Sequence, residues 1–303
     1  MGELVCRDLT KSYGTQKLAL NSVSFTASTN GIFTLIGRNG AGKSTLTRIL
    51  ATLLEPTSGK AEIDGLDVMK DARKLRERIA VVPQEGRAVA WVTPMQTVST
   101  YLMWRGYGYG ESRKRAMEAL SRVGLEKQAD RLNRMLSGGM KRKVLLSMVL
   151  ASEADIVFLD EPSTGLDPIS RRELWDVLIA LGQERFVFLT THYLEEAEQV
   201  SDRIAILEDG RLLSIGTLEG LRKEMKYGFS VVLPKDEAPP SQFVGEKYVR
   251  RDGKTQIFTT EEEALAMSKG LAEARARFSL NPVTLDDIFN FVVARDKERR
   301  EAK

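Results

Sequence analysis

The chain has 303 residues, 42% of them hydrophobic and 29% charged, which is typical of a globular protein of about two domains. Its 45 Lys and Arg residues nearly balance 42 Asp and Glu residues, so the strongly basic field of a dedicated nucleic-acid binder is excluded. The single cysteine, Cys6, excludes a disulfide framework and fits a reducing cytosol, and no apolar run reaches the roughly 18–20 residues that cross a bilayer.

Strands and one helix are predicted at the start of the chain. Residues 3–9 and 19–27 alternate well enough for half-buried strands, whereas the nearly continuous apolar run 31–37 indicates a strand buried on both faces. Residues 46–54 carry leucine and isoleucine at helical spacing, and Pro56 ends the predicted helix.

Strand and helix patterns then alternate, which favours an α/β sheet. Residues 85–151 are predicted to be mainly helical, with loops at 106–110 and 137–139. The other predicted elements are strands at 61–63, 79–82, 156–159 and 186–190, a helix at 170–181, and a hairpin of 203–207 with 211–215.

The composition changes after Met225, and residues 226–303 are predicted to form a small α+β accessory domain behind a first domain of residues 1–225. Residues 234–240 are rich in turn formers. The predicted elements are strands at 247–250 and 254–258 around a turn at 251–253, helices at 261–275 and 284–293, and a charged, solvated helix end at 295–303.

A glycine-rich loop lies between the buried strand at 31–37 and the following helix. It reads Gly37, Arg38, Asn39, Gly40, Ala41, Gly42, Lys43, Ser44 and fits the pattern G-x-x-x-x-G-K-[ST]. The glycines permit positive φ and close backbone approach, so that N–H groups can surround phosphates. Lys43 can reach the β- and γ-phosphates and the Ser44 hydroxyl can bind Mg²⁺. The context favours nucleotide binding over a plain strand–helix turn.

Two acids and the only histidine follow buried strands. Asp160 and Glu161 end one strand, and His192 ends the next. Beside a phosphate-binding loop, Asp160 can hold Mg²⁺ through water and Glu161 can orient or deprotonate the attacking water. His192 emerges from the same sheet edge, so contact with the γ-phosphate is favoured over a structural role.

One further motif separates the branches of P-loop NTPases. Alone, Leu136-Ser137-Gly138-Gly139-Met140 indicates only a helix N-cap. In order with Asp160-Glu161-Pro162, Thr164–Asp167 and His192, it resembles the ATP-binding cassette (ABC) transporter ATPases over about residues 1–220. The resemblance implies a P-loop NTPase core with an antiparallel β subdomain and a helical subdomain at about 85–151.

The resemblance also implies roles for individual residues. Tyr13 resembles the aromatic residue that stacks on adenine. Residues Gly37–Thr45 resemble the Walker A loop, in which Thr45 is the last residue. Gln84 resembles the Q-loop glutamine, which ligates Mg²⁺. Ser137, Gly138 and Gly139 resemble the signature that contacts the γ-phosphate held by the other protomer. Asp160 corresponds to the Walker B metal ligand, Glu161 to the catalytic base, Asp167 to the D-loop aspartate and His192 to the switch histidine.

A signature that binds the partner's ATP implies a dimer, expected to be a homodimer, with two ATP molecules sandwiched head to tail with Mg²⁺. The chain departs from the family at Met140, where glutamine is usual. Gly138–Arg142 and Asn281–Phe289 resemble the subgroup paired with ABC-2-type membrane subunits, which are mostly exporters. The chain is therefore expected at the cytoplasmic face of a membrane, without a nucleic-acid partner.

Other functions fit the sequence less well than an exporter ATPase does. A soluble ABC ATPase acting on ribosomes or DNA is disfavoured by the single cassette and balanced charge. A GTPase or small-molecule kinase leaves Ser137–Gly139 and His192 unexplained, and Glu161 and His192 disfavour a module without catalysis. Residues 89–104, rich in Trp, Met, Tyr and Val, fit either a groove for a membrane subunit's coupling helix or ordinary core packing.

Overall fold

The computed structural model describes residues 2–14, 17–234, 248–251 and 254–301. The chain divides into two compact units, Met1–Leu213 and Ser214–Lys303. The division of function between residues 1–225 and 226–303 stays a prediction.

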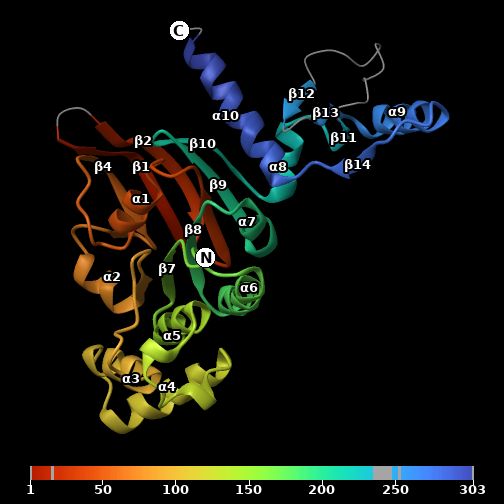
Figure 1. The fold of residues 1–303 in the computed structure, drawn as a ribbon. Helices are drawn as coiled ribbons and strands as arrows, with labels where there is room; N and C mark the ends of the chain where they lie inside the picture. Colours follow the sequence, from red (N-terminus) through yellow and green to blue (C-terminus); the bar gives the residue numbers. More distant parts are fainter. Residues whose placement is uncertain (1, 15–16, 235–247, 252–253, 302–303) are drawn as a thin grey trace. The chain divides into compact units, whose positions relative to one another are not determined.

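The first unit is built on a six-stranded sheet (Figure 1). Its strands, in spatial order, are β10 (Arg211–Gly216), β9 (Arg203–Glu208), β3 (Ile32–Ile36), β8 (Phe186–Thr191), β7 (Ile156–Asp160) and β6 (Ile79–Val82). All five from β9 to β6 are parallel. Every residue of β3, β7 and β8 is buried, which confirms the prediction of a strand covered on both faces at β3.

The register of this sheet brings three strand ends together. Ile36 at the end of β3 is paired with Thr191 of β8, and Thr190 is paired with Asp160 at the end of β7. Because the strands are parallel, the segments that follow them emerge at the same edge. The sheet therefore gathers the predicted motifs at one place.

Three helices follow these strands, and two of them differ in length from the prediction. They are α1 (Lys43–Leu50), α6 (Pro168–Glu184) and α7 (Leu194–Val200). The pattern at 46–54 predicts a longer α1, but Thr52 has a φ of 62°, which a helix cannot accommodate, and Leu53 is 60% exposed. Conversely, α6 extends beyond 170–181 because Asp167 caps it and Pro168 occupies its first turn.

A four-stranded antiparallel sheet confirms the expected β subdomain. Its order is β2 (Lys17–Ser28), β1 (Glu3–Tyr13), β4 (Ser58–Ile63) and β5 (Leu66–Asp67), with α2 (Ala72–Arg78) following in the chain. Asp64 and Gly65 both have positive φ in the turn between β4 and β5, as the sequence predicts for an Asp-Gly hairpin.

The helical subdomain consists of α3 (Pro94–Trp104), α4 (Tyr109–Arg122) and α5 (Gly138–Ala151), with 3₁₀ turns at Glu126–Gln128 and Asn133–Met135. Figure 1 shows the three helices gathered as one group. The predicted loop at 137–139 is wrong in one respect. Ser137 caps α5 by accepting a hydrogen bond from the Met140 N–H, and Gly138 and Gly139 already form the first turn of the helix.

The second unit contains a four-stranded antiparallel sheet. Its order is β12 (Tyr248–Arg251), β13 (Lys254–Thr259), β11 (Phe229–Leu233) and β14 (Ser279–Pro282), and its helices are α8 (Leu218–Glu224), α9 (Glu261–Glu273) and α10 (Leu285–Glu301). Its core comprises Val231, Leu233, Ile257, Met267 and Leu271. The helix predicted at 284–293 continues to 301, and the sequence does not predict α8, β11 or β14. The turns predicted at 235–240 and 252–253 lie outside the described residues. Among described residues, no helix is both long and apolar enough to span a membrane.

The core of the first unit generates a stability prediction. Phe188 is fully buried and contacts the rings of Phe33 and Phe158 at centroid distances of 5.3 and 5.5 Å. Phe188→Ala should lower the free energy of unfolding by about 3–5 kcal/mol, because it leaves a cavity between three parallel strands. Tryptophan fluorescence in urea measures this for the first unit alone, since Trp91, Trp104 and Trp175 all lie there. Phe188→Leu is the control and should cost less; equal, small losses for both would contradict the packing argument.

Candidate functional site

The loop between β3 and α1 can take its shape only with glycine at key positions. Gly42 has a φ of 107°, and a Cβ there would lie 2.3 Å from the Ala19 carbonyl oxygen. A Cβ at Gly37 would lie 2.2 Å from the Leu207 carbonyl oxygen. Both glycines are therefore required by close backbone approach, as the sequence predicts for a phosphate-binding loop.

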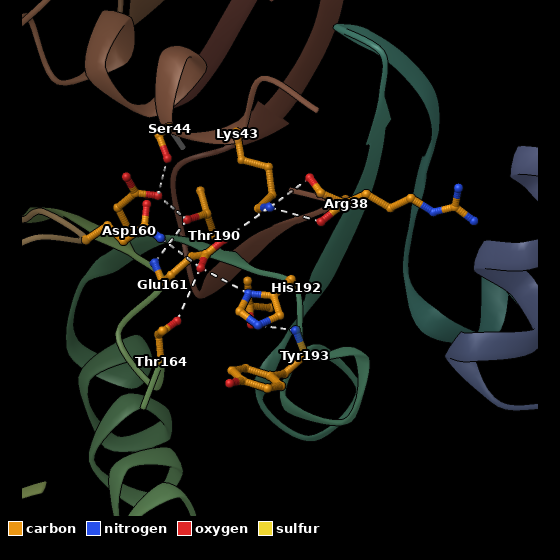
Figure 2. A network of polar contacts seen from close by, with 12 residues as sticks. Arg38, Lys43, Ser44, Asp160, Glu161, Thr164, Thr190, His192 and Tyr193 are labelled. Atoms are coloured by element: carbon orange, nitrogen blue, oxygen red, sulfur yellow. Dashed lines mark hydrogen bonds and ion pairs between the residues drawn. The ribbon is translucent and has the colours of Figure 1, made fainter. Parts of the chain in front are cut away.

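Lys43 is folded back over this loop and is only 4% exposed. Its Nζ donates to the carbonyl oxygens of Gly37 at 2.9 Å and Arg38 at 3.2 Å. The same Nζ pairs with Glu161 Oε1 at 3.1 Å (Figure 2). A buried ammonium group is thus held inside the loop, where phosphate oxygens would meet it.

Asp160 and Ser44 form the donor set expected for a hard cation. The Ser44 hydroxyl donates to Asp160 Oδ1 at 3.1 Å, and the Thr190 hydroxyl donates to the same oxygen at 2.5 Å. One carboxylate and one hydroxyl at a phosphate-binding loop suit Mg²⁺, which keeps several waters and uses phosphate oxygens as further ligands. These residues therefore fit the predicted metal.

The backbone of Glu161 is held in an unusual conformation. Its φ of 49° places a non-glycine residue in the left-handed region, which persists only where surrounding contacts enforce it. The Glu161 N–H donates to both the carbonyl and the hydroxyl oxygen of Thr190. The buried Arg142 donates to the Glu161 carbonyl oxygen at 3.1 Å. These contacts fix the direction of the side chain.

The Glu161 carboxylate is surrounded by polar groups from its own segment and from others. Its Oε2 lies 3.0 Å from His192 Nδ1, 3.2 Å from Gln84 Nε2 and 3.2 Å from the Thr164 hydroxyl. Burial on its own would raise the pKa of Glu161, but Lys43 and His192 outweigh it and hold the pKa below its ordinary value. Glu161 is therefore a carboxylate at neutral pH, as a general base must be.

A cavity of about 410 Å³ opens beside these groups. It is lined by Tyr13, Ala19, Asn39, Gly40, Gly42, Lys43, Ser44, Thr45, Gln84 and Glu161. Gly37 and Ala41 complete the loop, and Asp160 and His192 contact its lining residues through the bonds above. The half-exposed Tyr13 offers an aromatic face at the rim, with Lys11 Nζ 5.6 Å from the ring centre. The structure brings this part of the predicted set together.

Besides Gly37, Ala41, Asp160 and His192, four further predicted residues do not line this cavity: Ser137, Gly138, Gly139 and Asp167. Asp167 caps α6, and hydrogen bonds from Ser170 lower its pKa. A Cβ at Gly139 would lie 2.7 Å from Ser170 Oγ, so the start of α5 approaches the start of α6 closely. A Cβ at Gly138 would meet nothing within 4 Å.

Sequence reasoning missed three residues that shape the site. Thr190 lies inside an apolar strand pattern, and Arg142 lies on the helix that follows the signature, four positions after Gly138. Thr164 was noted only as part of a motif. Their roles depend on contacts between segments distant in the sequence, and no local pattern indicates them.

Comparison with known proteins identifies the family of the chain. The family described as "ABC transporter" matches residues 20–164. The Daunorubicin resistance ATP-binding protein DrrA3 of Streptomyces coeruleorubidus is 39% identical, covering 71% of this chain and 68% of that protein. The Nod factor export ATP-binding protein I of Rhizobium sp. (strain N33) is 34% identical, covering 95% and 96% respectively. Other relatives are longer, and the chain spans 10–59% of them.

Solved structures show the same fold. A dimeric ATP-binding cassette in a post-hydrolysis state, bound to ADP and Pi, matches with a TM-score of 0.65 and 27% identity, covering 71% of this chain and 98% of that one.

Two substitutions separate binding from hydrolysis. Glu161→Gln should reduce ATP turnover by at least about 100-fold, because the general base is lost, while ATP affinity is retained.

Lys43→Ala should weaken ATP binding by about ten-fold or more, because a buried charge-assisted contact disappears. Phosphate release and binding of a fluorescent ATP analogue measure the two effects.

Lys70→Ala is the control for Lys43→Ala, because Lys70 is exposed and does not line the cavity. Wild-type turnover in the Glu161→Gln variant would show that another group acts as the base.

Proposed function

The chain belongs to the ABC transporter family, and we propose that it powers export through a separate membrane subunit by ATP-driven closure of a head-to-tail dimer. The main support is the division of the predicted site. One chain gathers Lys43, Asp160, Glu161 and His192 at its own cavity but keeps Ser137–Gly139 outside it. A second protomer would supply the missing signature.

The proposal gives each side chain a role. The loop N–H groups and Lys43 would bind the phosphates, and Ser44 and Asp160, together with Gln84, would hold Mg²⁺, which would offset phosphate charge. Glu161, ionised and fixed in direction by Thr190 and Arg142, accepts a proton from the attacking water. His192 contacts the γ-phosphate from the side of Glu161 Oε2.

The geometry at Gly138 supports a partner protomer. A side chain there would meet nothing within its own chain, and its φ is not in the left-handed region, so the fold of one protomer does not require glycine. Close approach of another molecule at the start of α5 does explain the glycine. The Met140 side chain packs partly buried against the helical subdomain, so the departure from glutamine adds apolar contact within the chain.

Part of segment 89–104 is available to a membrane subunit. Met95, Val98 and Leu102 are buried, so core packing explains one face of α3. Trp104, at the end of α3, is 85% exposed beside a cleft of about 740 Å³. The cleft is also lined by Arg73, Arg76, Glu77, Arg105, Gly106, Tyr107 and Glu153. An exposed tryptophan beside charged side chains suits a helix end from a protein partner.

The choice of an ABC-2-type exporter rests on relatives and on sequence. One relative carries the name of a drug-resistance protein and another that of an export protein. In the segment Asn281–Phe289, Thr284 and Asp287 cap the start of α10 by bonding to each other. Leu285, Ile288 and Phe289 of the same segment are buried. That motif therefore stabilises the second unit, and the signature segment Gly138–Arg142 is the more direct support.

Gly138→Ala tests the dimer. Alanine should leave unfolding of the isolated chain unchanged or raise its midpoint slightly, since a helical glycine is replaced. It should nevertheless lower ATP hydrolysis and ATP-dependent dimerisation of the Glu161→Gln variant, measured by size-exclusion chromatography with Mg²⁺. Gly228→Ala is the control, because a Cβ there also meets nothing within 4 Å and its φ is not left-handed. Full dimerisation of the Gly138→Ala protein would contradict the shared site.

Fractionation of source cells tests the partner. The proposal places the chain at the cytoplasmic face of a membrane, held by its membrane subunit, so it should sediment with membranes through a salt wash. Trp104→Ala should release it, because an exposed anchor at the cleft is removed. Recovery with ribosomes or chromatin would favour the soluble ABC ATPase instead. Exposed Tyr109, outside the cleft, provides the matched control variant Tyr109→Ala.

A further inference from the structure

Two segments carry the catalytic groups, and each leads into a helix. Glu161 is followed by Ser163, Asp167 and α6, and His192 is followed by Tyr193 and α7. The distance of 3.0 Å between Glu161 Oε2 and His192 Nδ1 can be maintained only if the two helices keep a fixed relation. The contacts between α6 and α7 therefore control the alignment of base and histidine.

Rings connect the two segments on one side of His192. The ring centroids of His192 and Tyr193 lie 4.1 Å apart, and Figure 2 shows the two side chains next to each other. The Tyr193 N–H donates to Thr191 Oγ1 at 3.0 Å. Arg171, on the first turn of α6, places its guanidinium carbon 4.0 Å from the centre of the Tyr193 ring.

A buried carboxyl group also connects the two segments. Glu196, in the first turn of α7, is 0% exposed, and the Trp175 Nε1–H of α6 donates to its Oε1 at 3.1 Å. Burial raises the pKa of Glu196, while Thr191, Ser163, Trp175 and Arg171 act in the opposite direction. A carboxylate at this depth is costly unless its oxygens are hydrogen-bonded.

The second oxygen of Glu196 and the nearby Ser163 hydroxyl lack hydrogen bonds. Ser163 is also fully buried, and within the described part of the chain neither its Oγ nor Glu196 Oε2 has a hydrogen-bond partner of ordinary geometry. The two groups are near enough for Ser163 to affect the Glu196 carboxyl. A buried hydroxyl and a buried carboxyl oxygen that both lack a partner are stabilised by any shift that lets them form a hydrogen bond. Ser163 lies two residues from Glu161, so that shift acts on the base.

We propose that Glu196 is a positioning residue for ATP hydrolysis, which through Trp175 and Ser163 couples the segment after Glu161 to the segment that carries His192. Arg142 strengthens the link, because its buried guanidinium interacts electrostatically with both Glu196 and Asp160 and donates to the Glu161 carbonyl oxygen. Movement of the α6 start, where Asp167 and Ser170 lie, is thereby transmitted to the base and the histidine together. The inference rests on ATP hydrolysis at the site described above.

The kinetic test uses substitutions in the full chain. Glu196→Ala should lower kcat about ten-fold and Ser163→Ala about five-fold, the size expected for lost positioning hydrogen bonds, while KM for ATP changes less than about two-fold. Glu196→Gln should recover most of kcat, because it still accepts from Trp175. Glu195→Ala is the matched control, since Glu195 is the exposed neighbour on the same helix.

A second measurement does not depend on turnover. His192 is the only histidine in the chain, so with isotope-labelled histidine its ring signals in an NMR spectrum need no assignment. These signals should move in Ser163→Ala and Glu196→Ala and stay in place in Glu195→Ala. Ser163→Ala removes one oxygen and supports a conclusion even where Glu196→Ala fails to fold.

Wild-type kcat with unmoved ring signals in Ser163→Ala, together with wild-type kcat in any folded Glu196→Ala, would overturn the proposal. The proposal would also be overturned if the variants had a higher KM and less folded protein but a normal kcat per folded chain. Glu196 would then only stabilise the fold. Absence of hydrolysis in the wild-type chain would instead count against the proposed function, and the NMR comparison would still decide the role of Glu196.

Discussion

The site depends on one buried ion pair, Lys43 with Glu161. Their side chains are 4% and 6% exposed, and Nζ lies 3.1 Å from Oε1. Removing two charges from water costs several kcal/mol per ion, about as much as their attraction returns, unless further hydrogen bonds are made. Here Lys43 also bonds two loop carbonyls, and Glu161 also contacts Gln84, Thr164 and His192. The pair therefore joins the phosphate-binding loop to the catalytic segment.

Parallel pairing allows this pair to form. Lys43 follows β3 and Glu161 follows β7, and these strands are not neighbours, because β8 lies between them. β8 contributes Thr190, whose hydroxyl donates to Asp160 and whose hydroxyl and carbonyl oxygens both accept from the Glu161 N–H. The middle strand thus aligns the acids of β7 against the loop after β3. A one-residue slip would turn Thr190 to the other face and leave the backbone of Glu161 unsupported.

The sequence predicts most elements and most candidate residues, because their signals are local. The loop glycines, the acids after an apolar strand and the lone histidine each occupy a short motif, and the hairpin at Asp209-Gly210 follows from its turn residues, both of which have positive φ. Contacts between segments that are distant in the sequence leave no such local signal. Leucine spacing continues past Leu50 although Thr52 ends α1, and nothing near Arg142 indicates that it reaches the Glu161 carbonyl. The roles of Ser137–Gly139 and Asp167 in a partner's site stay predictions.

The saturation of Glu161 places a condition on its chemistry. Oε1 faces an ammonium group, and Oε2 has three polar neighbours within 3.2 Å. A carboxylate oxygen has two lone pairs, so Oε2 can take a proton from water only after at least two of its three neighbours have withdrawn. Oε1 has Lys43 as its one neighbour in these contacts, so the condition applies to proton transfer to Oε2. Thr164 and His192 belong to the two segments that lead into α6 and α7, which makes the relation of those helices a control on when Oε2 is free.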